Sequence, residues 1–334
     1  MASVAHTQEA AETRVRPLSV RITLWVGKYG ALVVLGILFV YFALTAKYFL
    51  SWSNVGEIFN EAALSCIISV GLTVVLIANQ FDLSIGYTAS LAGIVCAVLL
   101  MDGVPAPLAI LAAIAVGAIT GLINAFLVTR VHVNALVATL GVGSAAVGVN
   151  YFISGGAQQV FSIAVPNFTQ ISIGDWLGVP KDVYYMVAVS AIAWIVINRT
   201  VLGRNLQAVG GNAEAARLAG VNVQRVTSIA FVICGLCAAL TGVVLCTIVG
   251  SGQVTGGDGF TMEAFAAGFL GSAVLREGQF HILGTFVGVI IVALGFDGLT
   301  LVGVPSYVQY LFSGILLIAA VSVSSLARQV ARSA

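Results

Sequence analysis

Charged residues are scarce in this chain. Of its 334 residues, only 8% are Asp, Glu, Lys or Arg, whereas 60% are hydrophobic, and lysine occurs three times. A soluble domain of this size needs more charge than this to keep its surface solvated. The mean hydropathy of +1.07 instead indicates that lipid surrounds most of the surface. Because roughly 20 apolar residues cross a bilayer as a helix, the sequence predicts a polytopic membrane protein.

The shortage of lysine also excludes a phosphate-binding loop. Such a loop has the pattern G-x-x-x-x-G-K-[ST], in which the lysine reaches the phosphates of the nucleotide. Lys28 follows Gly27 but precedes Tyr29, and neither Lys47 nor Lys181 follows a glycine-rich stretch. If the protein moves a solute uphill, the energy must therefore come from an ion gradient or from another subunit.

Cysteine and histidine are too few and too scattered to predict a metal site. The five cysteines lie within apolar segments, and the three histidines lie in a tail and two short loops. Cys234 and Cys237 form a C-x-x-C pair, but no histidine or second pair accompanies it. We interpret these cysteines as small helix-packing residues. No catalytic residue, metal or cofactor is predicted.

Ten apolar segments predict an all-α membrane protein of about ten transmembrane helices. They cover approximately residues 29–46, 57–78, 84–101, 107–128, 135–153, 183–198, 226–250, 262–275, 280–300 and 304–323. The eighth segment is short for a full crossing. We expect it to be tilted, broken or partly buried within the protein.

Basic residues predict the orientation, because cytoplasmic loops are enriched in lysine and arginine. With ten spans and the N-terminus inside, only Lys47 and Lys181 fall outside. Twelve basic residues fall inside: Arg14, Arg16, Arg21, Lys28, Arg130, Arg199, Arg204, Arg217, Arg225, Arg276, Arg328 and Arg332. Both termini are therefore predicted to be cytoplasmic.

This topology divides the chain into a membrane domain with two cytoplasmic tails. The tails are expected over residues 1–28 and 324–334, and the membrane domain over residues 29–323. Within that domain, residues 154–182 form the predicted extracytoplasmic loop and residues 198–225 the largest cytoplasmic loop.

The cytoplasmic loop contains the signals of one short helix. Asn212 is a good N-cap, Glu214 falls in the first turn, Arg217 in the last, and Gly220 is placed to end the helix. A helix of about two turns is marginal in water by itself. We therefore expect it to be held in place by docking onto a partner, or else to lie on the protein's own cytoplasmic face.

A second polar segment interrupts the apolar sequence between the second and third predicted spans. It reads Asn79-Gln80-Phe81-Asp82-Leu83-Ser84-Ile85-Gly86. Polar backbone at membrane depth persists only where it is buried in protein or lines a wet cavity. The segment is thus either a capped cytoplasmic turn, with Asp82 and Ser84 capping the third helix, or a helix break that shapes the solute pathway.

These two segments resemble the permease subunits of ribose-type ABC sugar importers. The family pattern G-G-I-D-L-S-V-G is matched by Asp82, Leu83, Ser84 and Gly86, and Thr139-Leu140-Gly141 is similar to the family's T-L-G. Its cytoplasmic loop pattern G-R…A-x-G-x-N-x-x-A-A-x-x-[AS]-G-[IV] is matched by Gly203, Arg204, Ala208, Gly210, Asn212, Ala215, Ala216, Gly220 and Val221. Gly235, Ala238, Ala239, Leu240 and Gly242 match the helix that follows. The resemblance covers about residues 55–322.

The resemblance implies a permease subunit that works with partners and makes or breaks no covalent bond itself. The implied partners are an ABC ATP-binding subunit, an extracytoplasmic solute-binding protein, and a second permease copy or a paralogous permease. The implied location is the lipid bilayer of the bacterial inner membrane. No nucleic-acid partner is expected. The implied ATPase-coupling residues are Gly203, Arg204, Gly211, Asn212, Glu214, Ala215, Ala216, Arg217 and Gly220. The candidate pathway residues are Asn79, Gln80, Asp82, Ser84 and Asp297.

Three departures from the family pattern concern the substrate or the partners. Asn79, Gln80 and Phe81 replace the first three residues of the first motif, and Asp297 replaces the asparagine of an N-G-L motif. The third departure lies in the motif G-G-T-S-L-x-G-G-x-G-S-x-L-G-T. Several of its small residues are replaced here by the charged or bulky residues Arg276, Glu277, Phe280 and His281.

Two other classes of membrane protein compete with this interpretation. An ion-coupled secondary transporter needs ionisable residues in its bundle, and the candidates are Glu57, Glu61, Asp258, Glu263 and Asp297, most of them at span ends. A membrane enzyme needs a catalytic constellation, and none is recognisable. For an ABC permease the expected solute is a monosaccharide or related polyol. Nucleosides, a furanosyl signal molecule and branched-chain amino acids are the alternatives.

Overall fold

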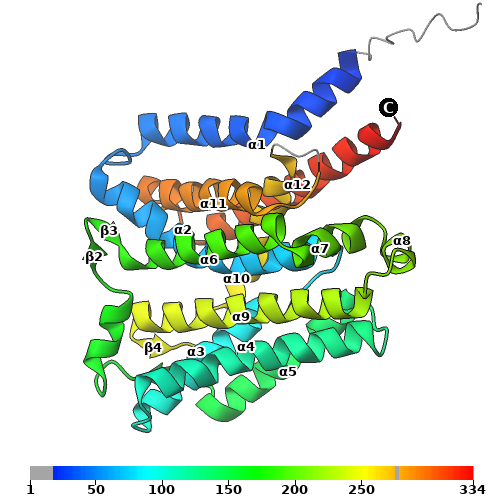
Figure 1. Cartoon of the computed structure of the whole chain (residues 1–334). Coiled ribbons are helices and arrows are strands. Elements are labelled where there is room, and N and C mark those ends of the chain that lie inside the picture. The colour runs from blue at the N-terminus through cyan, green and yellow to red at the C-terminus, as the bar shows by residue number, and fades with distance from the viewer. Residues whose placement is uncertain (1–17, 275–277, 334) are drawn as a thin grey trace, which may run out of the picture.

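The computed structural model describes residues 18–274 and 278–333, which form a bundle of long helices (Figure 1). The helices are α1 (Leu18–Thr45), α2 (Trp52–Ile77), α3 (Ile85–Met101), α4 (Ala106–Thr129), α5 (Ala135–Ser154), α6 (Lys181–Arg199), α7 (Val201–Gly211), α8 (Ala213–Leu218), α9 (Val223–Val249), α10 (Asp258–Ala273), α11 (Ile282–Val302) and α12 (Tyr307–Ser333). A 3-10 helix, η1 (Pro166–Ile171), and four two-residue strands complete the described part: β1 (Gln159–Val160), β2 (Asp175–Trp176), β3 (Val179–Pro180) and β4 (Ser251–Gly252).

Each of the ten predicted apolar segments coincides with a helix. Six of these helices are long and apolar enough to cross a membrane, namely α2, α4, α5, α6, α9 and α11. Shorter apolar stretches lie at Tyr29–Thr45 in α1, at Ile85–Met101 in α3 and at Tyr307–Ser322 in α12. The protein is therefore an all-α, multi-pass membrane protein.

Two helices extend far beyond the predicted segments. Helix α1 begins at Leu18, within the expected N-terminal tail, and α12 continues to Ser333, beyond the predicted end of the last span. Helix formation thus continues past the apolar stretch at both places. Helix α10 is short, as expected, and is largely buried through Ala264, Ala266 and Ala267. Arg14, Arg16, Arg276 and Glu277 lie outside the described residues.

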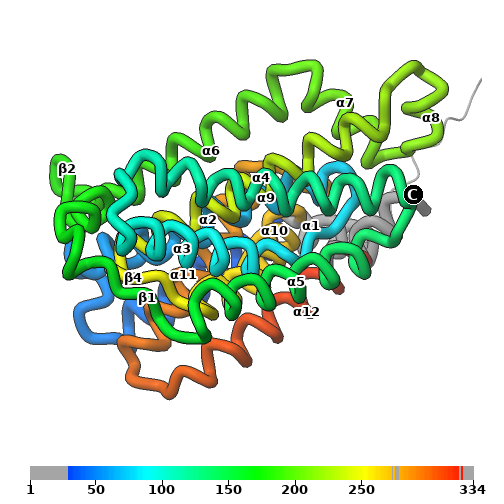
Figure 2. Tube along the Cα trace, turned by 90° about the horizontal axis from the view of Figure 1, so that it is seen from below, coloured from blue at the N-terminus to red at the C-terminus, as the bar shows by residue number. Residues whose placement is uncertain are grey.

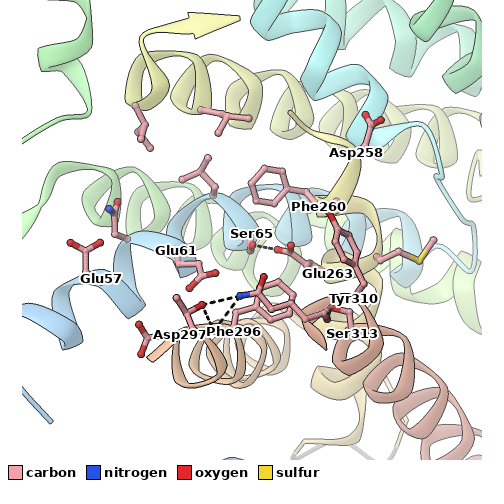
Figure 3. Close-up of a pocket in the computed structure, with 18 of the residues that line it drawn as sticks. Glu57, Glu61, Ser65, Asp258, Phe260, Glu263, Phe296, Asp297, Tyr310 and Ser313 are labelled. Carbon is pink, nitrogen blue, oxygen red and sulfur yellow. Dashed lines mark hydrogen bonds between the residues drawn. The ribbon is translucent and has the colours of Figure 1, made fainter. Parts of the chain in front are cut away.

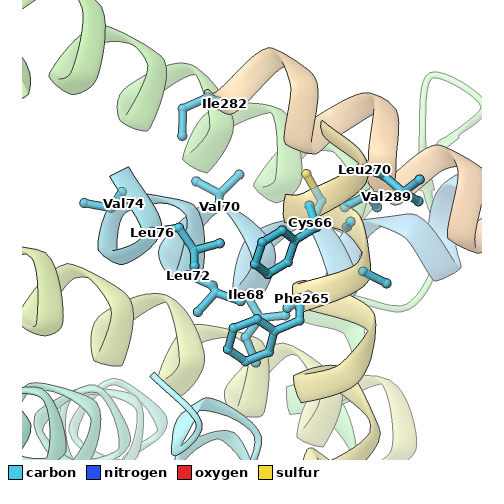
Figure 4. Packing of buried hydrophobic residues seen from close by; sticks show 14 of the residues in the cluster. Cys66, Ile68, Val70, Leu72, Val74, Leu76, Phe265, Leu270, Ile282 and Val289 are labelled. Carbon is cyan, nitrogen blue, oxygen red and sulfur yellow. The ribbon is translucent and has the colours of Figure 1, made fainter. Parts of the chain in front are cut away.

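Helix α2 forms the centre of the bundle. Its residues from Ala62 to Ile77 are all buried, and α6, α9, α10 and α11 pack around it. Ile68, Val70 and Leu72 meet Phe265 of α10 and Val289 of α11 in the main apolar cluster (Figure 4). A helix that is apolar on every side is stable when other helices cover all of its faces, which explains the central place of α2.

Small residues let two helices approach closely beside this centre. Helices α4 and α9 cross at Gly117 and Gly235, and a methyl group added to either would overlap the carbonyl oxygen of the other. Glycine at such positions brings helix backbones together in lipid. This crossing fixes α4 against α9.

Polar side chains begin several helices, including one in a segment that departs from the family pattern. The side chains of Asn134 and Asn222 accept hydrogen bonds from backbone N–H groups of α5 and α9. Gly284 N–H donates to Nδ1 of His281 at 2.9 Å, while Nε2 of His281 lies 2.7 Å from the carbonyl oxygen of Val274. Phe280 packs edge-on against Phe269, with ring centroids 5.2 Å apart. Both unusual residues therefore stabilise the start of α11.

The two ends of the bundle differ in structure. At one end, drawn at the left in Figure 1, lie β2, β3 and the connection between α1 and α2. There β1 pairs with β4, and β2 pairs with β3, both antiparallel. The opposite end carries α8, the start of α1 and the end of α12. Seen at right angles, α6, α7 and α8 follow one edge of the bundle and α12 the other (Figure 2).

Candidate functional site

A large cavity opens between five helices. Its volume is about 1120 Å³, and its lining comes from α2, α9, α10, α11 and α12. Glu57 and Glu61 come from the first turns of α2, Thr300 from the last turn of α11 and Tyr310 from the first turn of α12. These helix ends meet at the end of the bundle opposite α8 (Figure 1). The cavity therefore faces that end.

Five carboxylates line this cavity, and they are Glu57, Glu61, Asp258, Glu263 and Asp297 (Figure 3). No lysine, arginine or histidine is among the lining residues that the structure describes. The cavity thus concentrates acidic side chains without a basic partner in its wall.

Neutral side chains hold three of the five carboxylates in place. Asn54 Nδ2 donates to Asp297 Oδ2 at 2.8 Å. Ser65 Oγ donates to Glu263 Oε2 at 2.5 Å, and Ser90 Oγ donates to Asp258 Oδ1 at 3.1 Å. Hydrogen bonds from neutral donors orient a carboxylate but leave its charge uncancelled, so these groups stay able to attract a ligand of opposite charge.

The polar segment between α2 and α3 lies elsewhere, as a buried break between the two helices. Asp82 and Ser84 are 1% and 2% exposed. The N–H and hydroxyl groups of Ser84 donate to Asp82 Oδ1 at 2.9 and 2.5 Å. Asn124 Nδ2 donates to Ser84 Oγ at 2.9 Å and lies 3.4 Å from both carboxylate oxygens of Asp82. Asp82 therefore closes a buried turn just before α3 by accepting from Ser84, and the side chain of Ser84 makes no cap hydrogen bond to the helix. A role of this segment in the solute pathway stays a prediction.

The break lies inside the helical bundle rather than at its surface. Asn124 precedes the end of α4 at Thr129 by five residues, or about 8 Å along a helix axis. Leu83 N–H donates to Thr139 Oγ1 of α5 at 3.0 Å, and Gly86 N–H donates to Thr261 Oγ1 of α10 at 3.2 Å. The break thus joins α2 and α3 to three other helices.

The short helix predicted in the cytoplasmic loop is α8. Ala215 N–H donates to Asn212 Oδ1 at 3.0 Å, and Gly220 has a left-handed φ of 85°. Arg217 and Glu214 form an exposed ion pair at 2.7 Å. Leu218, an apolar residue, is 81% exposed at the tip. Helix α8 therefore projects from the bundle with an apolar side chain uncovered.

A further helix, α7, links α8 to the buried break, and the sequence did not predict it. Gly203 and Arg204 lie in α7, and Gly211 ends it. A methyl group added to Gly210 would overlap the carbonyl oxygen of Ile77, the last residue of α2. The last turn of α7 thus rests directly on the end of α2, beside Asn79.

The predicted site residues fall into three separate places. The coupling residues gather on α7, α8 and the Gly220 turn. Asn79, Gln80, Asp82 and Ser84 lie in the break and do not line the cavity, whereas Asp297 does. The cavity also includes Asn54, Phe260 and Tyr310, which nothing in the sequence distinguished from other polar and aromatic residues near helix ends.

Comparison with known proteins gives consistent matches over most of the chain. Residues 54–321 match the family described as the permease component of the branched-chain amino acid transport system. The ribose import permease protein of Escherichia coli strain K12 is 33% identical over 303 residues, which is 90% of this chain and 94% of the relative. The D-allose transport system permease protein of the same strain is 32% identical over 303 residues, or 90% and 92% of the two chains.

A third relative is the L-arabinose transport system permease protein of the same strain. It is 30% identical over 294 residues, or 88% of this chain and 89% of the relative. No solved structure matches the chain significantly.

Proposed function

This chain belongs to the family of permease components of the branched-chain amino acid transport system, and on that premise we propose that it carries a monosaccharide or related polyol across the membrane. A permease component is a translocation subunit and not an enzyme. The relatives' names support the solute class, because they are permeases for ribose, D-allose and L-arabinose. Nucleosides, a furanosyl signal molecule and branched-chain amino acids are the alternatives within this class of transporter.

The proposed assembly contains a pair of permease chains, two ATP-binding subunits and an extracytoplasmic solute-binding protein. Its location is the bacterial inner membrane. Ten spans with both termini in the cytoplasm fit the twelve basic residues on one side and the two on the other. In this topology the cavity faces outward, toward the binding protein, and α8 faces the ATP-binding subunit.

Helix α8 is the proposed contact that transmits ATP-driven movement. The observation that supports this most strongly is the exposed, fully capped helix with uncovered Leu218 at its tip. Helix α7 continues the path, because its Gly210 packs against the end of α2. A push on α8 would reach the buried break through these rigid contacts. Packed elements transmit such movements as rigid bodies.

The test is transport and ATPase association by variants of α8. Gly220→Pro forces φ from 85° to about −65°, and Glu214→Lys replaces the ion pair with Arg217 by like charges. Each variant should insert into the membrane normally. Each should lose ATP-driven uptake in proteoliposomes, and the ATP-binding subunit should no longer co-purify with it.

Asp175→Lys serves as the matched control, because it reverses an exposed charge at the opposite end of the bundle. This control should retain the ATP-binding subunit. Full uptake and subunit retention by both α8 variants would contradict the proposed contact.

A further inference from the structure

Five of the thirteen acidic residues of the chain line the cavity between α2, α9, α10, α11 and α12. Acidic residues within a membrane bundle normally pair with a basic residue or with one another. Among the residues that the structure describes, the one ion pair is that of Arg217 with Glu214, far from the cavity on α8. Grouped charges of one sign repel one another, so a positively charged ligand would stabilise this arrangement.

Asp297 gives the sharpest sign of a missing partner. The residue is 9% exposed, and its side chain lines the cavity. One carboxylate oxygen accepts a hydrogen bond from Asn54 at 2.8 Å, and the other has no partner among the described residues. Glu57 and Glu61 of α2 face the same space from across the cavity (Figure 3). A carboxylate oxygen that lines a cavity and accepts no hydrogen bond from the protein is free to accept one from a charged donor.

The rest of the lining suits a hydroxylated organic molecule. Hydroxyl and amide groups of Thr300, Gln309 and Ser313 supply neutral hydrogen bonds. Phe260 and Tyr310 supply aromatic faces, which pack against sugar rings and attract cations. A bare divalent metal fits less well, because the described residues contain no group of three or more His, Cys, Asp or Glu that could hold one.

We propose that the cavity admits a solute that carries a protonated amine on a hydroxylated body, which is the chemistry of an amino sugar or an amino polyol. This inference rests on the proposed function and narrows its solute class. The amine lies between Asp297 and the carboxylates of α2, and the hydroxyl groups reach the amide and hydroxyl side chains of α11 and α12. Asp297, where the family pattern has asparagine, supplies the charge that selects the amine.

The experiment compares two probes, glucosamine and glucose, which differ by an amine in place of one hydroxyl group. Saturation-transfer NMR on the purified permease complex in lipid nanodiscs detects weak binding directly and requires no ATP. Glucosamine should give a strong signal and glucose a weak one. Glu61→Gln and Asp297→Asn should each weaken glucosamine binding by about tenfold, the loss expected for one hydrogen bond to a charged group. Excess magnesium chloride should not displace glucosamine.

The matched control is Asp102→Asn, which neutralises an exposed carboxylate that does not line the cavity. This variant should bind glucosamine as the unmodified protein does. Equal signals from the two probes, no signal from glucosamine, or undiminished binding by Glu61→Gln and Asp297→Asn would each overturn the proposal. Displacement by magnesium would assign the cavity to inorganic cations instead.

Failure of this inference differs from failure of the proposed function. Glucose and glucosamine that bind equally would remove the charge selection but leave ATP-driven uptake intact. Loss of the function itself would appear in the α8 variants, whose readout is retention of the ATP-binding subunit.

Discussion

Individual carboxylates inside this bundle have two kinds of surroundings. Asp82 is fully buried, and it accepts hydrogen bonds from Ser84 while Asn124 lies beside it. Asp297 also accepts a hydrogen bond, but it lines an open cavity with four other acidic residues. The first arrangement holds a backbone break rigid, because the acceptor oxygens of Asp82 are used within the protein. The second leaves acceptors available to a solute.

Replacement of Asp82 tests whether its buried hydrogen bonds hold the break between α2 and α3 rigid. Asp82→Ala removes the acceptor for the N–H and hydroxyl groups of Ser84. Loss of a comparable side-chain acceptor at a helix cap costs about 0.5–2 kcal/mol, which sets the scale expected here. We expect a lower melting temperature and slower uptake at matched membrane abundance. Asp82→Asn, which keeps one acceptor oxygen, should lose less. Unchanged uptake by Asp82→Ala would reduce the segment to an ordinary turn.

The sequence predicted Asp82 better than it predicted the cavity. The contact between Asp82 and Ser84 was accessible to local reasoning, because the two residues are two positions apart in one polar segment. Glu57 and Asp297 are separated by 240 positions of sequence, and only the packing of α2 beside α11 brings them to one space. The sequence singled out the cavity carboxylates only as ionisable residues that a secondary transporter would need, most of them at span ends, and no local pattern could reveal their common cavity.

Among the elements, helix α7 connects the exposed and buried parts of the molecule. It runs from the end of α6 to Asn212, the residue that caps α8. Leu206 and Val209 bury its apolar face, while Gly210 lets its last turn approach the carbonyl of Ile77. Helix α7 is thus fixed at both ends and suited to carry a displacement.

Two neighbouring glycines of α7 give a matched test of this connection. Gly210→Ala should force α7 away from the end of α2, because its methyl group would overlap the backbone there. Overpacking of this kind costs about 1–3 kcal/mol. Gly211→Ala has no atom within 4 Å of the added group and should behave as the unmodified protein.

Stimulation of ATP hydrolysis by the loaded binding protein is the measurement for this pair. We expect Gly210→Ala to retain basal hydrolysis and lose most of the stimulation. Equal stimulation in Gly210→Ala and Gly211→Ala would show that the contact between α7 and α2 transmits nothing.

Elements were predictable where hydrophobicity or capping residues determine them. Asn212 and Gly220 marked the limits of α8 correctly, because a cap and a left-handed glycine act locally. Helix α7 was missed, because Gly203, Gly210 and Gly211 lower the helix propensity of its sequence. Contacts with α2, α6 and α9 stabilise it instead. The pairing of β1 with β4 joins segments distant in sequence and was equally inaccessible.

At the scale of the whole molecule, the cavity and α8 lie at opposite ends of the bundle (Figure 1). An importer needs this separation, because solute arrives on one side and ATP is hydrolysed on the other. The helices between them, with α2 at the centre, connect the two ends.

Accessibility of single cysteines tests which end faces outward. Gln170 is exposed on η1, and Ala219 is exposed beside α8. Gln170→Cys should react with an impermeant maleimide on intact cells, and Ala219→Cys should react only after permeabilisation. Four of the five native cysteines are buried, and a parent chain with all five replaced by serine or alanine removes any background. The reverse pattern of labelling would invert the topology.

The most direct test of the central claim is cross-linking of α8 to the ATP-binding subunit in the assembled transporter. Leu218 at the end of α8 is 81% exposed, so Leu218→Cys is labelled with a maleimide that carries a short photoreactive diazirine. Gln170→Cys, labelled in the same way, serves as the control at the other end. The account predicts a covalent product of permease and ATP-binding subunit from residue 218, and none from residue 170. Absence of that product from residue 218, or its formation from residue 170, would contradict the account.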